Sequence, residues 1–342
     1  MKSNTLWPRY VVLKFVGNLH SPRLSDPISP LDLGISVVVP VYQAKSHLSL
    51  FVRVLSETMH QLGQEWEVIL VDDCSPDNSW LTIVELSKDH PNIIGLRLST
   101  NSGQHAALLA GIRQARYSTT ITMDDDLQHQ PQDIPILLTE LGAGVDLVYA
   151  TSKDEEHSAW RNLTSGLSKL ILAGAVGRQQ SLILSAFRAF RTRLRDSWID
   201  VNDPFVSIDV LLSWSTNKVS SVEVAMHQRD FGVSGYTFRK LMKHFFNMAT
   251  GYSVKPLRLV TYIGLLFSFG GFIVLGILVL QRLISQTNTP GFAFLASLIT
   301  VIGGLHLFCL GILGEYLGRI HIRSTRRPAY TISEYLQDGK ST

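Results

Sequence analysis

The residues best suited to chemistry in this sequence are two clusters of aspartates, each at the end of an apolar run. Asp72 and Asp73 form the first cluster, and Asp124-Asp125-Asp126 form the second. Carboxylates this close together repel one another unless a cation neutralises them. Gln128 adds another oxygen two residues later, and hard oxygen ligands of this kind suit Mg²⁺ or Mn²⁺. The second cluster is therefore a candidate metal site.

Both clusters also have purely structural interpretations. Three consecutive aspartates are typical of an exposed turn, and Asp72-Asp73 ahead of Ser75-Pro76-Asp77-Asn78 suits a turn followed by a helix cap. No Walker sequence and no Gly-x-Gly-x-x-Gly motif follows the first apolar run, so a diphosphate bound here would depend mainly on metal. The 11 histidines show no zinc-ligand spacing, and Cys74 and Cys309 are not expected to form a disulfide.

Apolar runs that alternate with segments of helical spacing identify the elements that carry these residues. The alternation predicts βαβ units, and hence an α/β fold with a doubly wound, mostly parallel sheet. Ligands of such sheets bind beyond the carboxyl ends of the strands, where the two aspartate clusters would meet. The predicted strands are 35–39, 67–71, 93–98, 119–123 and 145–150, and the predicted helices are 46–62, 78–88, 104–115 and 132–141.

Composition limits the class of protein. The chain has 342 residues, of which 45% are hydrophobic and 17% charged, and its mean hydropathy is +0.15. Soluble domains carry about 25% charged residues, so this composition argues against a disordered or purely soluble protein. The net charge is +3, from 31 basic and 28 acidic residues, and predicts no nucleic-acid partner. The length allows two folding units.

Two long apolar segments near the C-terminus, Leu257–Gln281 and Gly291–Gly314, predict a membrane hairpin. As helices of roughly 25 residues with a rise of about 1.5 Å each, they would cross a hydrocarbon core of about 30 Å. Two buried helices of a soluble protein are the alternative. Arg282 is the one basic residue of the connector, whereas several flank the outer ends of the hairpin. We therefore expect a multi-pass protein of the cell (inner) membrane, embedded in the lipid bilayer with a cytoplasmic catalytic domain.

The segments around the hairpin complete the predicted organisation. Tyr236–Thr250 has the pattern of an amphipathic helix in the membrane interface, although a soluble surface helix would show a similar stripe. Glu315 and Arg319 are spaced to form a helix-end ion pair. The predicted domains are an N-terminal extension (1–33), a catalytic α/β domain (34–235), a juxtamembrane amphipathic helix (236–254), two transmembrane helices (255–318) and a cytoplasmic tail (319–342).

The order of short motifs along the chain resembles family 2 glycosyltransferases with the GT-A fold. The motifs are Val-Pro-Val-Tyr ending at Tyr42, Val-Asp-Asp-Cys-Ser-Pro-Asp ending at Asp77, Asn-Ser-Gly-Gln-His-Ala-Ala ending at Ala107, and Met-Asp-Asp-Asp-Leu-Gln ending at Gln128. Later segments are similar to the polyprenyl-phosphate branch of this family, which includes bactoprenol glucosyltransferases and undecaprenyl-phosphate 4-deoxy-4-formamido-arabinose transferases. These segments are 227–236, 256–258, 314–319 and 327–328, and the resemblance covers roughly residues 35–332.

The resemblance implies inverting transfer of a sugar from a nucleotide-diphosphate sugar, UDP more than GDP, to polyprenyl phosphate. It implies Mg²⁺ or Mn²⁺ as cofactor and is compatible with a homo-oligomer. The residues it assigns to the nucleotide are Pro40, Tyr42, Asp72, Asp73 and Asp124, and those it assigns to the metal are Asp126 and Gln128.

A lipid-phosphate acceptor would need cations near the membrane. A phosphate monoester is already anionic near neutral pH and can attack without a general base. Arg161 and Arg229 are the best candidates to bind it, although Arg161 also suits a helix cap and Arg229 a surface pair with Asp230. Together with these two arginines, the acceptor site is expected to contain Lys169 and Ser234, and the catalytic groups are expected to be Asp124, Asp126, Arg161 and Arg229.

Some positions depart from the family pattern. Ala44 stands where members often carry Glu, and Gly235 stands where they carry Lys. The alternative function is a membrane-bound enzyme with a hydroxyl acceptor, such as a polysaccharide or glycolipid synthase. Such an enzyme should show a Glu-Asp base and a Gln-x-x-Arg-Trp signature, which this sequence lacks.

Overall fold

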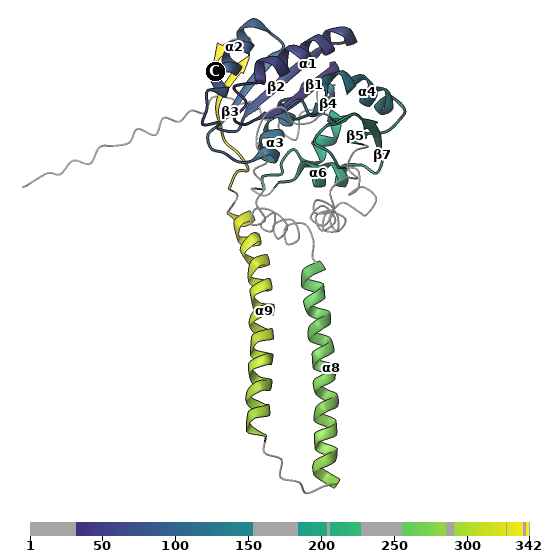
Figure 1. The fold of residues 1–342 in the computed structure, drawn as a ribbon, viewed down its shortest axis with the longest axis vertical. Coiled ribbons are helices and arrows are strands. Elements are labelled where there is room, and N and C mark those ends of the chain that lie inside the picture. The colour runs from purple at the N-terminus through teal and green to yellow at the C-terminus, as the bar shows by residue number, and fades with distance from the viewer. Residues whose placement is uncertain are drawn as a thin grey trace, which may run out of the picture.

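The computed structural model describes residues 32–152, 184–203, 206–226, 255–284, 291–325, 327–337 and 340–341. They form one α/β domain and two long helices that extend from it side by side (Figure 1). The strands are β1 (Asp32–Val41), β2 (Trp66–Asp72), β3 (Ile93–Leu98), β4 (Tyr117–Thr122), β5 (Leu147–Ser152), β6 (Arg188–Arg191), β7 (Val219–Val224), β8 (Ile332–Gln337) and β9 (Lys340–Ser341). The helices are α1 (Leu48–Leu62), α2 (Ser79–Asp89), α3 (Gln104–Gln114), α4 (Ile134–Gly142), α6 (Ile208–Ser215), α8 (Lys255–Ile284) and α9 (Phe292–Ser324), with short 3₁₀ turns at Pro131–Asp133 and Thr192–Trp198.

The described strands form a single sheet in the order β7-β5-β6-β4-β1-β2-β3-β8-β9. Strands β4, β1, β2 and β3 are parallel neighbours, as the βαβ alternation predicts. The expectation of a mostly parallel sheet needs correction, because four of the eight pairings are antiparallel. Strand β6 runs antiparallel between β4 and β5, and β8 runs antiparallel to β3. The α/β sheet is therefore confirmed, and it is mixed.

The side chains of β1 point alternately to the two faces of the sheet and contribute to a separate part of the core on each face. Val37 and Val39 belong to the cluster under α1, α2 and α4, whereas Val38 belongs to the cluster under α3 and α6. Successive side chains of a strand point to opposite faces, so a strand buried on both sides is a continuous apolar run. Helix α3 packs closely because Gly111 faces the sheet, where an added Cβ would lie 2.4 Å from Val38. This contact fixes α3, whose first residue borders the site described below.

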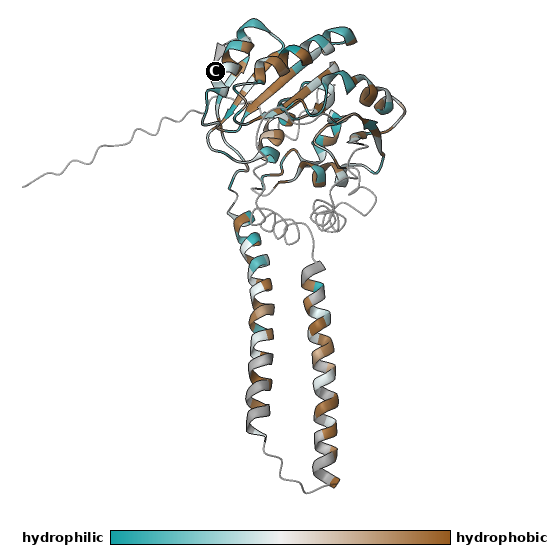
Figure 2. Cartoon of the chain, in the orientation of Figure 1, coloured by the Kyte–Doolittle hydropathy of each residue, from teal (hydrophilic) through white to brown (hydrophobic). Residues whose placement is uncertain are grey.

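Helices α8 and α9 contain 30 and 33 residues and carry many exposed apolar side chains, which the hydropathy colouring makes visible (Figure 2). Within the parts of the chain that the structure describes, none of the helices combines the length and apolar character that a membrane crossing requires.

The predicted ion pair between Arg319 and Glu315 is confirmed, with 2.9 Å between nitrogen and oxygen. Both cysteines are free.

After α9 the chain returns to the α/β domain. Arg323 in the last turn of α9 pairs with Asp203 at 2.7 Å, and the C-terminus lies beside α2 and β3 (Figure 1). The segment predicted as a cytoplasmic tail thus contains strand β8 of the α/β sheet. The N-terminal extension, apart from its last two residues, and the predicted amphipathic helix lie outside the described residues.

Candidate active site

Four neighbouring parallel strands bring their carboxyl ends to one edge of the sheet. The loops that leave β1, β2 and β4 each contain a residue with a left-handed backbone: Gln43 (φ 58), Cys74 (φ 53) and Leu127 (φ 55). Non-glycine residues rarely adopt this conformation, which costs roughly 1–2 kcal/mol, and such strain tends to gather at functional sites. Among the described residues these three are the complete set of non-glycine residues with positive φ. Backbone strain and the aspartate clusters therefore coincide at this edge.

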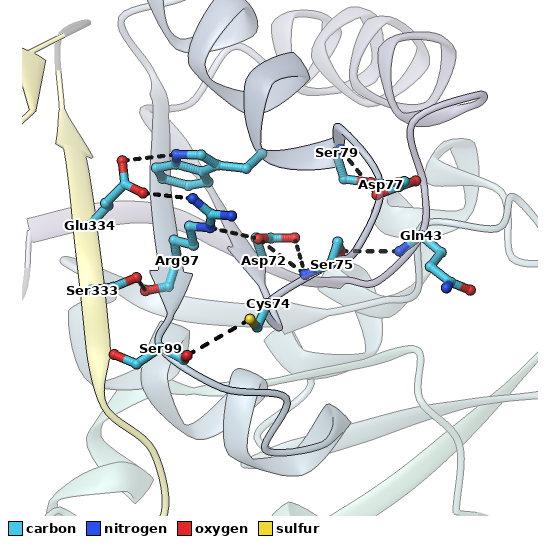
Figure 3. A network of polar contacts seen from close by, with 11 residues as sticks. Gln43, Asp72, Cys74, Ser75, Asp77, Ser79, Arg97, Ser99, Ser333 and Glu334 are labelled. Carbon is cyan, nitrogen blue, oxygen red and sulfur yellow. Dashed lines mark hydrogen bonds and ion pairs between the residues drawn. The ribbon is translucent and has the colours of Figure 1, made fainter.

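The loop after β1 is held by the loop that leads into α2. The Gln43 N–H donates to Ser75 Oγ at 3.1 Å (Figure 3). The Ala44 N–H donates to Ser79 Oγ at 2.9 Å. Asp77 accepts the Ser79 N–H at 3.1 Å and so satisfies a donor in the first turn of α2. Tyr42 stays 48% exposed at this edge. Tyr42 is thus carried on a loop that these hydrogen bonds hold, and it is accessible to a ligand.

Asp72 ends β2 and is completely buried. Its oxygens accept the Ser75 N–H at 3.3 and 3.4 Å, and Arg97 Nε lies 3.5 Å from Oδ2 (Figure 3). Burial raises the pKa of the Asp72 carboxyl, while the hydrogen bonds from Ser75 and the charge of Arg97 oppose the rise. Arg97 is thus the charge partner of a buried carboxylate at the edge of the site.

Asp73 joins the loop after β2 to the loop after β3. Its two carboxylate oxygens accept the Ser102 N–H at 2.7 Å and the Gly103 N–H at 2.8 Å. Burial raises the pKa of Asp73, and these two backbone hydrogen bonds oppose the rise. Gly103 has φ +91, a conformation that suits glycine, and precedes the first residue of α3. Asp73 therefore supports the site by holding the entry to α3.

The three consecutive aspartates after β4 have different surroundings. Asp124 accepts a 2.6 Å hydrogen bond from Gln104 Nε2, and Asp126 accepts the Gln128 N–H at 3.2 Å within a tight turn. Asp125 instead faces α1, where its Oδ1 lies 3.7 Å from His47 Nε2. Burial raises the pKa of Asp125, and the hydrogen bond with Asp125 raises that of His47. The middle aspartate is thus a structural partner of α1.

The donor set that remains, Asp124, Asp126 and Gln128, fits Mg²⁺ or Mn²⁺ by its chemistry. All three residues are half-buried and lie in one turn, and their oxygens are hard ligands. No group of three or more His, Cys, Asp or Glu side chains is arranged to hold a metal within the described ranges. Mg²⁺ sites commonly use one or two carboxylates and complete the shell with water and substrate phosphate.

A buried arginine supports the end of β4 from behind. Arg188 Nε donates to Thr122 Oγ1 at 2.9 Å, and the Thr122 hydroxyl donates to the Ala186 carbonyl at 2.9 Å. The Arg188 guanidinium also forms an ion pair with Asp209 in the first turn of α6. These contacts fix the strand end immediately before Asp124.

All seven predicted donor-side residues lie at this edge. They are Pro40, Tyr42, Asp72, Asp73, Asp124, Asp126 and Gln128. The predicted acceptor residues Arg161, Lys169, Arg229 and Ser234 lie outside the described residues.

Sequence reasoning overlooked Arg97, Gln104 and Glu334. The sequence does contain an indication that Arg97 has a special role, because Arg97 is the one charged residue in the otherwise apolar run 93–98. Gln104 stands in the motif Asn-Ser-Gly-Gln-His-Ala-Ala, whose residues received no predicted role in the site.

Comparison with known proteins finds relatives that match most of the chain. The chain is 31% identical to an undecaprenyl-phosphate 4-deoxy-4-formamido-L-arabinose transferase of Photorhabdus laumondii over 310 residues, which span 90% of this chain and 95% of the relative. It is 32% identical to the protein of the same name from Proteus mirabilis, over 88% of this chain and 93% of that protein. A solved structure of glucosyl-3-phosphoglycerate synthase from Mycobacterium tuberculosis matches with a TM-score of 0.48 and 16% identity, over 65% of this chain and 85% of the other.

The sequence profile described as glycosyl transferase family 2 matches residues 36–197, a range that contains the loops after β1, β2, β3 and β4. Together with relatives above 30% identity along nearly the whole chain, this match shows that the protein is a glycosyltransferase that belongs to glycosyl transferase family 2.

Proposed function

We propose that this protein transfers a sugar, with inversion, from a nucleotide-diphosphate sugar to polyprenyl phosphate of the undecaprenyl type, and that the nucleotide is UDP. The observation that carries the proposal is the extent of the similarity. The family profile ends at residue 197, whereas the alignment with an undecaprenyl-phosphate transferase covers 90% of this chain. The similarity therefore includes much of the sequence that follows the family profile, which is where a lipid acceptor would bind.

In this proposal the donor occupies the edge formed by β1, β2 and β4. Tyr42 offers an exposed ring beside Pro40 for the base, and the Asp72 carboxylate accepts a hydrogen bond from the nucleoside. Asp73 supports the pocket through the loop before α3. Asp124, held by Gln104, faces the diphosphate end of the donor.

Asp126 and Gln128 would hold the Mg²⁺ or Mn²⁺ ion, which when bound supplies Lewis-acid stabilisation to the departing diphosphate. The chemistry of this turn supports the assignment, because it offers carboxylate and amide oxygens and no soft ligand. Gln104 keeps Asp124 oriented beside that turn through the 2.6 Å hydrogen bond.

The acceptor phosphate binds Arg161, Lys169, Arg229 and Ser234 and attacks the anomeric carbon from the face opposite the nucleotide. A phosphate oxygen forms a bond to C1 while the bond from C1 to the diphosphate oxygen breaks, and the nucleoside diphosphate leaves with that electron pair. No proton has to be removed from an anionic phosphate, so the reaction requires no general base. One displacement inverts C1 and gives a lipid-linked monosaccharide.

The proposal includes a membrane anchor formed by the two long apolar segments near the C-terminus, with the catalytic domain in the cytoplasm at the inner membrane. In the printed sequence, residues 257–281 and 291–314 are almost entirely apolar or small. Exposed side chains such as Leu265, Leu266 and Leu307, each at least 68% exposed, would be covered by lipid. Basic residues at both domain-proximal helix ends, Lys255 and Arg323 among them, suit the cytoplasmic side.

The test uses the purified full chain in detergent with a short-chain polyprenyl phosphate and a panel of radiolabelled nucleotide sugars. We expect one or a few UDP-sugars to give a labelled lipid together with free UDP, with the transfer abolished by EDTA and restored by Mg²⁺ or Mn²⁺. The matched control is the corresponding polyprenol, which lacks the phosphate and should accept no sugar. Transfer to the alcohol, or to a glycan hydroxyl in place of the lipid phosphate, would reject the proposal.

A further inference from the structure

Strand β8 follows the two long helices in the sequence and belongs to the same sheet as the strands of the site. It pairs antiparallel with β3, with Arg97 opposite Glu334 and Gly95 opposite Leu336. The Ser99 N–H donates to the Thr331 carbonyl at 2.8 Å, and Leu336 is buried in the core. Because β3 carries Arg97 to the edge of the donor site, the segment after α9 lies one strand away from that site.

Glu334, on this neighbouring strand, binds the Arg97 side chain. Its Oε1 accepts a hydrogen bond from an Arg97 terminal nitrogen at 2.8 Å, and its Oε2 accepts Trp80 Nε1–H at 3.0 Å (Figure 3). The guanidinium carbon also lies 5.8 Å from the centre of the Trp80 ring. Arg97 and Glu334 are 34% and 40% exposed, so these contacts decide where an otherwise mobile arginine points.

The other side of the guanidinium faces the donor site. Arg97 Nε lies 3.5 Å from Oδ2 of the fully buried Asp72 (Figure 3). Ser75 also stabilises Asp72, through its hydroxyl and through its backbone N–H at 3.3 and 3.4 Å, but Arg97 is the cation that acts on this carboxylate, and the nearby carboxylates Asp73 and Asp77 repel it. A buried carboxylate needs a charge partner or strong hydrogen bonds to keep its charge and direction.

We propose that Glu334 is a positioning residue of the donor site, which acts through Arg97 to hold the Asp72 carboxylate in place for the nucleoside. The segment after α9 is then part of the nucleotide site as well as the end of the sheet. This inference rests on the proposed function in that it takes Asp72 to contact the donor nucleoside.

The first test replaces Glu334 by Gln, which keeps the size of the side chain and removes its charge. We expect the KM for the nucleotide sugar and the Kd for UDP to rise about 5- to 20-fold, with kcat changed less than about twofold, because the lost interaction orients the donor and not the reacting atoms. The matched control is Ser333→Ala on the same strand. Ser333 Oγ donates to the Arg97 carbonyl at 3.1 Å and leaves the guanidinium untouched, so KM should not change. An equal rise in both variants, or no rise in Glu334→Gln, would overturn the inference.

The second test separates positioning from strand docking by exchanging the two charges in the double variant Arg97→Glu/Glu334→Arg. The exchange restores an ion pair between β3 and β8 but places a carboxylate beside Asp72. We expect thermal stability to recover relative to either single variant while the KM for the donor stays high. Recovery of KM together with stability would show that Glu334 only docks the strand.

The test of the positioning role of Glu334 can fail independently of the test of the proposed function. UDP binding to Glu334→Gln can be measured by calorimetry whether or not polyprenyl phosphate is the acceptor. Failure of the wild-type protein to glycosylate polyprenyl phosphate would reject the acceptor assignment alone. Unchanged UDP affinity in Glu334→Gln would reject the positioning role alone.

Discussion

Arg188 in β6 and Asp209 in the first turn of α6 form an ion pair in the interior of the α/β domain, directly behind the strand that delivers the second aspartate cluster. Arg188 is about 1% exposed and also donates to Thr122 at the end of β4. The pair thus joins three segments that are far apart in the sequence. A buried ion pair gives little net stability compared with an apolar substitute. Removing one partner of such a pair, however, leaves an unpaired charge in the interior.

Replacing Arg188 by Met should therefore lower the free energy of unfolding by about 3–5 kcal/mol, because Asp209 is left without its partner. The double variant Arg188→Met/Asp209→Leu should recover most of that loss. Denaturant unfolding of the purified protein measures both values. The control is Arg193→Met. Arg193 pairs with Asp146, but its side chain is 69% exposed, so this substitution should lower the free energy of unfolding by at most about 1 kcal/mol. Equal losses in the two single variants would contradict the role of the buried pair.

Asp126→Asn should reduce sugar transfer at least about 100-fold, since it removes the charge of a metal ligand. Membrane insertion should be unchanged, and excess Mn²⁺ should restore part of the activity if weaker metal binding causes the loss. Initial rates across a Mn²⁺ titration provide the measurement. Asp89→Asn, at the exposed end of α2, serves as the control and should behave like wild type. Wild-type turnover in Asp126→Asn would remove this residue from the metal site.

His47 predicts a pH dependence of stability. The hydrogen bond with Asp125 raises the pKa of His47 above its ordinary value of 6.5, against the opposing effect of burial. A base with a raised pKa in the folded state stabilises the fold fully below 6.5, and this contribution is lost as the pH rises through the folded-state pKa. In EDTA, the stability of wild type should therefore fall from about pH 6 to about pH 8 more steeply than that of His47→Gln.

The comparison variant for this pH series is His60→Gln, in the helix α1 that His47 precedes. His60 packs against the Trp66 ring, with 5.2 Å between the ring centroids, and forms no ion pair with a carboxylate among the residues that the structure describes. Its stability curve should run parallel to that of wild type. Parallel curves for wild type and His47→Gln would contradict the coupling between His47 and Asp125.

Arg229→Ala should raise the KM for polyprenyl phosphate about tenfold while the Kd for UDP stays unchanged, because a charge-assisted bond to the acceptor phosphate is lost. Steady-state kinetics with varied lipid at saturating donor measure the first quantity, and calorimetry measures the second. Arg53→Ala removes an exposed arginine of α1 and serves as the control. Unchanged acceptor dependence in Arg229→Ala would refute its role.

The sequence alone determined the alternation of strands and helices through residue 150. Strand β3 has the predicted bounds, and β1, β2 and α1 differ from the predicted ranges by at most three residues at either end. This success has a local cause, since a strand buried on both faces must be a continuous apolar run and the helices between such strands show apolar spacing. Because parallel strands end at one edge, the sequence also predicted that Asp72 and Asp124 would meet.

The tertiary structure alone decided which strands became neighbours and which carboxylates face the site. Strand β6 is inserted antiparallel between β4 and β5, and β8 joins β3 from a segment more than 230 residues later. Both are short, and their pairing depends on partners far away in the chain, so no local pattern specifies it. Likewise, Asp125 turns toward His47 while Asp124 and Asp126 lie in the site turn, because the backbone after β4 and the position of α1 select the direction of each side chain.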